Sequence, residues 1–221
     1  MKVRLVSLWI VLALACMAIA TALAAADQDT CASLAKQKYD KVTITAAVFM
    51  NDPLGFLPPK TPGIFGTPAG LKVTAPFCRV IGFIEPVQNS HINFEVWLPP
   101  AAKWNSRYFA VGNPAFEGAI KYQGLARAIE KDYATGSTDT GHDDPGHKWA
   151  MGHPERVVDW THRAVHETTV VAKRLIQAFY GRPVRYAYWD NCHNGGRQGL
   201  TEAQLYPEDF DGIVAGDPAY Y

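Results

Sequence analysis

Residues 186–200 read YAYWDNCHNGGRQGL, and this stretch decides the fold. The aromatic run that ends at Trp189 predicts a buried strand, which begins at Arg185. The polar residues that follow predict a sharp turn, and the run from Gly195 to Tyr206 predicts a helix. Units in which a strand leads through a short turn into a helix build parallel sheets, so this stretch indicates an α/β fold.

The turn has the layout of a nucleophile elbow, the strained strand-to-helix turn written G-x-S-x-G. In that motif the serine hydroxyl is lifted above the sheet, and the next N–H points at the developing oxyanion. Here Asn191 replaces the first glycine, His193 replaces the serine, and Gly195 is intact. Asn and His are tolerated at positive φ, so we expect the turn to form. A histidine cannot form the acyl intermediate of an activated serine, so we expect the serine chemistry to be lost.

Composition predicts one globular domain and no nucleic-acid partner. The chain has 221 residues, a formal net charge of +0 and 48% hydrophobic residues. This length and balance fit a single domain, which we place at residues 27–221. Because the chain is neutral and has no run of lysine or arginine, it lacks the electrostatic footprint of a nucleic-acid-binding protein.

The N-terminus has the pattern of a secretory signal peptide. Lys2 and Arg4 precede an apolar run over residues 5–23, and small residues follow up to Ala26. We therefore assign residues 1–26 to a signal peptide, with an uncleaved membrane anchor as the alternative. We expect the mature protein to be secreted or periplasmic and free of the membrane.

The mature chain has an odd number of cysteines, so one thiol has no partner within it. Cys16 is removed with the signal peptide, which leaves Cys31, Cys78 and Cys192 in an oxidising compartment where thiols tend to pair. An odd number has three explanations: a free thiol, a disulfide-linked dimer, or a partner outside this sequence. The sequence does not predict the oligomeric state.

The order of the predicted elements divides the chain into an antiparallel opening and an alternating α/β remainder. The opening contains predicted strands at residues 41–45, 77–84 and 92–98, with a proline- and glycine-rich loop at 51–70. We expect it to form an antiparallel layer that precedes the main, mostly parallel sheet with right-handed crossovers. The main part has predicted strands at 108–112, 133–137, 185–189 and 212–216, helices at 124–131, 158–180 and 195–206, and a polar loop at 139–154.

Several stretches resemble the tannase and feruloyl esterase family of secreted α/β-hydrolases. The resemblance runs in family order from about Cys31 to the end, and it implies the N-terminal half of an α/β-hydrolase-type sheet. It also implies the hydrolysis of carboxylic esters of gallic, ferulic or related phenolic acids, without a cofactor, by a Ser-His-Asp triad. The matching stretches are APFCRV (75–80), FEVWLP (94–99), WN with RYF (104–109), VGN (111–113), STDTGH (137–142), RAVH (163–166), GGRQG (195–199) and PEDFDGIVAG (207–216).

The resemblance also implies roles for single residues. Cys31 and Cys78 match an N-terminal disulfide, and Cys192 matches a cysteine whose partner lies beside the catalytic histidine of the family. His193 stands at the position of the nucleophilic serine, and Asn194 supplies one oxyanion N–H. The other donor comes from a glycine-rich turn that here reads Pro114-Ala115; proline has no N–H, so Ala115 is the candidate.

The resemblance therefore implies a carboxylic ester hydrolase domain that lacks the catalytic residues of its triad. The serine is replaced, and Tyr221 comes before the strands that carry the aspartate and histidine of the triad in the family. We expect an inactive fragment or a degenerate copy, with a small aromatic ester as its ligand if it binds one. The alternative is a non-catalytic protein that binds phenolic ligands.

Other polar residues have a functional and a structural interpretation, and we favour the structural one. His193 itself is either a general base or metal ligand, or a turn residue. His162 and His166, one helical turn apart near Asp159, fit a packed or capped pair, because no third ligand is in sight. Ser137 and Thr138 are assigned to a strand end, and no metal is expected. The remaining candidates share one loop that could hold a metal but matches no ligand spacing, so a solvated loop is favoured: Asp139, His142, Asp143, Asp144, His147 and His153.

Overall fold

A computed structural model describes residue 22 and residues 24–63, 65–144 and 146–219. The predicted signal peptide at 1–26 lies outside the described residues except for residues 22 and 24–26. Residues 24–34 are helical, and a disulfide between Cys31 and Cys78, with the Cα atoms 5.6 Å apart, ties this helix to the sheet. This is the pair that the family resemblance implied. Among the described residues no helix has both the length and the apolar character needed to cross a bilayer.

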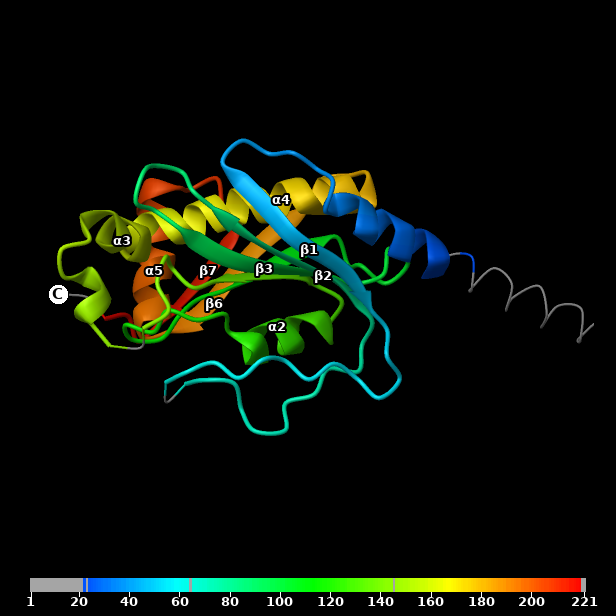
Figure 1. Cartoon of the computed structure of the whole chain (residues 1–221), viewed down its shortest axis with the longest axis horizontal. Helices are drawn as coiled ribbons and strands as arrows, with labels where there is room; N and C mark the ends of the chain where they lie inside the picture. Colours follow the sequence, from blue (N-terminus) through cyan, green and yellow to red (C-terminus); the bar gives the residue numbers. More distant parts are fainter. Residues whose placement is uncertain (1–21, 23, 64, 145, 220–221) are drawn as a thin grey trace, which may run out of the picture.

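One twisted sheet of seven strands forms the centre of the described part of the chain (Figure 1). Its strand order is β1-β2-β3-β5-β4-β6-β7, so β5 lies between β3 and β4. The pairs from β1 to β5 are antiparallel, and those among β5, β4, β6 and β7 are parallel. The strands are β1 Val42–Met50, β2 Phe77–Ile84, β3 Ile92–Leu98, β4 Arg107–Val111, β5 Ala134–Thr138, β6 Tyr186–Cys192 and β7 Gly212–Gly216.

The predicted α/β class is confirmed, with one difference in the layout. The antiparallel strands do not form a layer of their own: β3 pairs with β5 over Phe94 to Trp97 and continues directly into the parallel half. Pairing satisfies the backbone groups that would otherwise be exposed along the edge of β5, which favours one continuous sheet over two separate ones.

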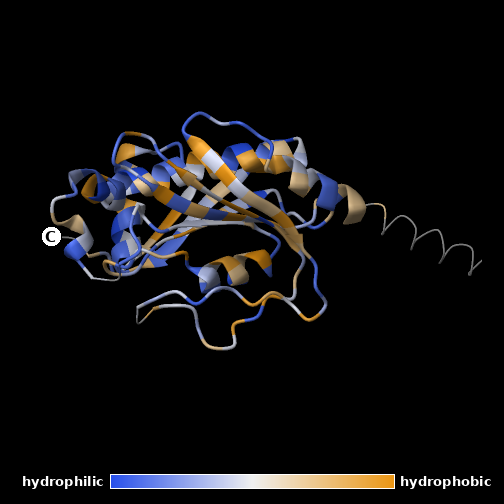
Figure 2. Ribbon diagram, viewed as in Figure 1, coloured by the Kyte–Doolittle hydropathy of each residue, from blue (hydrophilic) through white to orange (hydrophobic). Residues whose placement is uncertain are grey.

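Helices cover both faces of the sheet (Figure 1). Residues of α4 pack with strand residues in one apolar cluster, and residues of α2 pack with Phe77 and Trp97 in a second. Figure 2 shows hydrophobic residues running along the strands between these helices. The helical segments are α2 Tyr122–Ile129, η1 Lys148–Ala150, α3 Pro154–Val158, η2 Asp159–Arg163, α4 Ala164–Tyr180 and α5 Asn194–Leu205.

The long helix predicted at 158–180 begins earlier and contains a π-turn, η2. Asp159 starts this turn with a fully buried side chain, whose carboxylate accepts hydrogen bonds from Ser90 Oγ at 2.8 Å and from Arg163 Nε at 2.6 Å. π-turns of this kind mark places where a helix makes room for a specific contact. The helix ends as predicted, at Gly181 with φ +68.

Candidate functional site

The elbow lies where β6 passes into α5, and His193 occupies its apex. The backbone of His193 has φ 61 and ψ −129, a conformation that costs a side-chain-bearing residue about 1–3 kcal/mol. Backbone hydrogen bonds hold it: His193 N–H donates to Gly216 O at 3.1 Å, and His193 O accepts from Arg197 N–H at 3.2 Å. The side chain is exposed, and no described group is hydrogen-bonded to its imidazole. The turn therefore has the strained, outward-pointing geometry of a nucleophile elbow without a nucleophilic hydroxyl.

Close approaches explain the two glycines after the apex. A Cβ on Gly195 would lie 2.4 Å from Asn191 Oδ1, and one on Gly196 would lie 2.4 Å from Gly216 O. Asn191 replaces the first glycine of the motif without strain in its φ, which is not positive. Its side chain accepts from Cys192 N–H at 2.9 Å and donates to Gly112 O at 3.2 Å. Asn191 thus ties the elbow to the end of β4.

The two turns expected to supply oxyanion donors are linked by a hydrogen bond. Asn194 is buried at the first position of α5, where an N–H has no acceptor within the helix. Its side chain donates to Asn113 O at 3.2 Å, next to the Pro114-Ala115 turn. Asn113 in turn donates from its N–H to Gln198 Oε1 at 3.0 Å. Ala115 has φ 48, a positive value that a glycine would adopt without strain.

A cavity and an aromatic pair adjoin the elbow. The cavity, of about 290 Å³, is lined by His193, Cys192, Gly112 and Pro114 among others. Cys192 is exposed and is the free cysteine of the described residues. On α5, Arg197 donates to Asn194 Oδ1 at 2.7 Å and lies 4.2 Å over the ring of Trp160.

Phe116 extends the aromatic surface beside the elbow. It stacks on Trp160 with ring centroids 5.3 Å apart, yet 49% of its surface is exposed. An exposed ring supported by a second ring can bind an aromatic ligand by stacking. The sequence predicts core packing for most of its aromatic residues and does not single out Trp160 as one that lines a site, because a single aromatic residue in a helix gives no signal of its neighbours.

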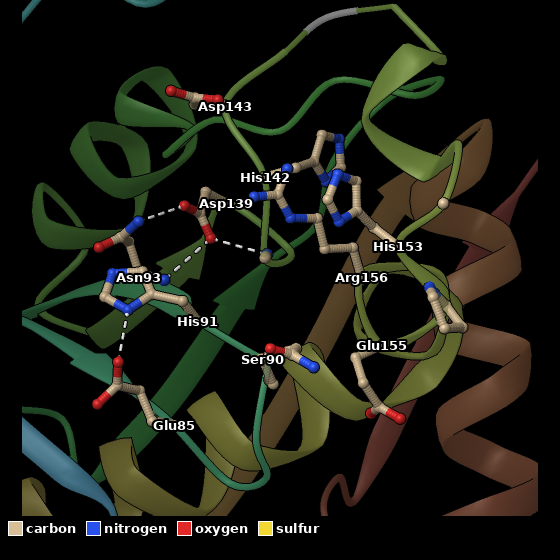
Figure 3. A pocket seen from close by; sticks show the side chains of 14 residues that line it. Glu85, Ser90, His91, Asn93, Asp139, His142, Asp143, His153, Glu155 and Arg156 are labelled. Carbon is tan, nitrogen blue, oxygen red and sulfur yellow. Dashed lines mark hydrogen bonds and ion pairs between the residues drawn. The ribbon is translucent and has the colours of Figure 1, made fainter.

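The loop at 139–154 is less solvated than predicted. Asp139 is buried and accepts hydrogen bonds from Asn93 N–H at 3.0 Å, Asn93 Nδ2 at 2.6 Å and Gly141 N–H at 2.9 Å (Figure 3). Burial raises the pKa of Asp139 to about 7. His142 is buried, with a pKa lowered by burial; it stacks on Trp149 and contacts Phe116 O through Nε2 at 2.8 Å. The prediction of a solvated loop is therefore wrong for these two residues, because β3 and η1 cover them.

The other residues of this loop follow the structural interpretation. His147, His153 and Asp143 are exposed, and Asp144 is half-buried. A polar cavity of about 650 Å³ is lined by Asp139, Asp143 and His153, among others (Figure 3).

The two hydroxyls at the end of β5 serve the scaffold. Ser137 Oγ accepts from Lys121 N–H at 3.0 Å, and Thr138 Oγ1 donates to Asn93 O at 2.9 Å.

His162 and His166 bind two different partners. His162 Nδ1 lies 2.9 Å from Tyr206 Oη, and His166 Nδ1 lies 2.6 Å from Asp209 Oδ2. Neither pairs with Asp159. Sequence spacing could not identify Asp209 as a partner, because 43 residues separate it from His166.

The strand order and the elbow together define a protein of the α/β-hydrolase type. The sequence model of the family described as "Tannase and feruloyl esterase" matches residues 78–221, and the chain belongs to this family. The predicted family membership is confirmed.

Individual relatives agree with this assignment. The chain is 40% identical over 161 residues to an uncharacterized esterase of Xanthomonas campestris pv. campestris, and 38% identical over 147 residues to a probable feruloyl esterase B-2 of Aspergillus flavus. These matches cover 71% and 66% of this chain, and 28% of each relative. The crystal structure of feruloyl esterase B from Aspergillus oryzae superposes with a TM-score of 0.80 at 32% identity, covering 88% of this chain and 38% of that one. The chain thus spans less than a third of the length of the Xanthomonas and Aspergillus flavus relatives, and little more than a third of the crystallised chain.

Proposed function

We propose that this chain carries the elbow and oxyanion half of a site for carboxylic esters of aromatic acids, and that His193 makes it inactive as a serine hydrolase. The observation that carries the proposal is the backbone of His193, at φ 61 and ψ −129, directly before a helix N-terminus. This geometry serves to present a nucleophile above an oxyanion site. Two similar proteins are named feruloyl esterases, which supports an ester substrate whose acyl group is aromatic.

Such a site has two tasks: it binds the ester oxygen as negative charge develops there, and it supplies the nucleophile that attacks the carbonyl carbon. The N–H groups of Asn194 and Ala115 would hold the ester oxygen as negative charge develops on it. In the serine mechanism a hydroxyl attacks the carbonyl carbon while a base removes its proton. An imidazole at position 193 has no such hydroxyl. The site therefore keeps the groups that bind the ester oxygen and loses acyl transfer to residue 193.

A second candidate function is the binding of phenolic ligands without turnover. The cavity beside His193 and the exposed ring of Phe116 on Trp160 favour it, because both offer contact to an aromatic ring. We further propose that the protein is exported. The Cys31–Cys78 disulfide supports this, since such bonds persist in oxidising compartments.

Two assays on the purified chain test the proposal. Turnover of p-nitrophenyl acetate and methyl ferulate should equal a buffer blank, and His193→Ala should not change it. Calorimetry with ferulate and gallate esters should show saturable binding that weakens in Phe65→Ala, whose ring lines the cavity, and in Phe116→Ala, whose exposed ring stacks on Trp160. Leu54→Ala, an exposed apolar side chain that does not line the cavity, should bind as the parent does. Turnover that is lost in His193→Ala would overturn the inactivity, and absence of heat with every ester and acid would overturn the binding function.

A further inference from the structure

Three ionisable side chains from separate elements meet on the α4 and α5 side of the molecule. His166 lies on α4, Glu202 lies on α5, and Asp209 lies in the segment before β7. One potential ligand atom from each residue lies within 4.8 Å of the other two. Glu202 is eight residues beyond Asn194, so at ~1.5 Å per residue the cluster lies roughly 12 Å along α5 from the elbow. The cluster is therefore separate from the candidate ester site.

No group among the described residues donates a hydrogen bond to Glu202. Its residue is 1% exposed, and both carboxylate oxygens are buried without a hydrogen-bond partner among the described residues. Burial and the neighbouring Asp209 raise the pKa of Glu202, since an uncompensated buried carboxylate is costly. Because no described group pairs with this carboxylate, a bound cation or a proton must neutralise it.

Lys173 acts on Glu202 only through its charge, which lowers the pKa of Glu202, and forms no hydrogen bond with it. Lys173 Nζ lies 3.9 Å from Asp209 Oδ1 and donates to Glu208 O at 3.0 Å. Tyr206 stacks on His166 with ring centroids 3.8 Å apart and fixes the plane of its imidazole. The side chain of His166 is 29% exposed, which leaves one side of the cluster open to solvent and to an entering ion.

We propose that His166, Glu202 and Asp209 form a binding site for one divalent transition-metal ion, with Zn²⁺ as the preferred ion. One imidazole nitrogen and two carboxylate oxygens are a donor set that zinc accepts, with water at an open fourth position. The two carboxylates match the charge of the ion. The ion would join α4, α5 and the segment before β7, and so stabilise the helix that follows the elbow.

To bind zinc, the three ligand atoms must move slightly closer to a common central point. A point within about 2.8 Å of all three atoms exists when no two are more than 4.8 Å apart, and zinc bonds to nitrogen and oxygen are ~2.0–2.2 Å long. His166 Nδ1 and Asp209 Oδ2, now 2.6 Å apart, would separate, because adjacent ligands of one ion lie roughly 3 Å apart. Binding thus replaces the His166–Asp209 hydrogen bond with two metal bonds, and it releases a proton if one is shared there.

The test is zinc binding by the whole chain in a Cys192→Ser background, which removes the exposed thiol as a competing ligand. After treatment with a chelator and its removal, calorimetry with Zn²⁺ should give one site, and Zn²⁺ should raise the thermal midpoint. Glu202→Gln keeps the shape and removes the charge; it should weaken binding by more than the ~10- to 100-fold that loss of an outer-shell partner costs. His147→Ala, on an exposed loop, should bind as the parent does.

Several results would overturn the proposal. They are the absence of zinc binding in the parent, equal affinity in Glu202→Gln, and a loss in His147→Ala instead. A stable parent that binds no zinc would mean that a proton neutralises Glu202. If Glu202→Gln fails to fold, Asp209→Asn supplies the same comparison, and its full zinc affinity would count against the site.

Discussion

Replacement of His193 by glycine should stabilise the protein, because the elbow holds a residue with a Cβ in a conformation that suits only glycine. At φ 61 and ψ −129 the backbone cost is about 1–3 kcal/mol. The side chain is exposed and has no described hydrogen-bond partner, so its removal costs little. Glycine gives back ~0.4–1 kcal/mol through the greater freedom of the unfolded chain. The expected net gain in the free energy of unfolding is therefore about 1.3 kcal/mol, the difference between the midpoints of these two ranges.

Urea unfolding followed by tryptophan fluorescence measures this gain, and a matched series isolates its cause. His193→Ala keeps a Cβ and should leave the midpoint close to that of the parent, since any L-residue shares the strain. Asn89→Gly alters an exposed residue at φ 68, where asparagine is well tolerated, and should gain less. If His193→Gly and His193→Ala have equal stability, or if the glycine variant is less stable, the backbone at the elbow is not strained and the reasoning fails.

Three further predictions concern the scaffold. Cys31→Ala with Cys78→Ala opens a loop with a sequence separation of 47 residues, so the free energy of unfolding should fall by about 4 kcal/mol in chemical denaturation; a loss below ~1 kcal/mol would contradict this. Burial raises the pKa of Asp139 to about 7 from an unfolded value near 3.8, so the folded state binds the proton more tightly and stability should fall as pH rises from about 4 to 7. Asp139→Asn, an uncharged isostere, should flatten that fall in urea midpoints, and an unchanged slope would exclude Asp139 as its source. Gly112→Ala would place a Cβ 2.5 Å from Trp189 Cζ2 and should cost ~1–3 kcal/mol, visible as a lower midpoint, whereas a neutral effect would show that Trp189 can move.

Local patterns in the sequence predicted most of the elements. The strands at 77–84 and 92–98 have the predicted bounds, because alternation and flanking glycine and proline act over short distances. The elbow was predicted from residue types alone, and its positive φ at His193 follows from the need to turn from a strand directly into a helix.

What sequence patterns did not predict depends on long-range contacts. The union of antiparallel and parallel strands through β3 and β5 depends on pairing across about 40 residues. Asp159 interrupts the helix at a π-turn because Ser90, 69 residues away, meets its carboxylate. The burial of Asp139 and the meeting of Glu202 with His166 have the same origin. Polar residues in polar surroundings carry no local signal that a distant element will cover them.

The most direct test of the central claim is the mass of the chain after reaction with an activated aromatic ester. The purified protein would be mixed with p-nitrophenyl ferulate, quenched in acid within seconds to preserve acyl intermediates, and analysed by intact-mass and peptide mass spectrometry. The account predicts an unmodified peptide containing His193, as in the His193→Ala control. A feruloyl adduct on His193 that decays as p-nitrophenol accumulates would show that the histidine acts as the nucleophile, and it would contradict the account.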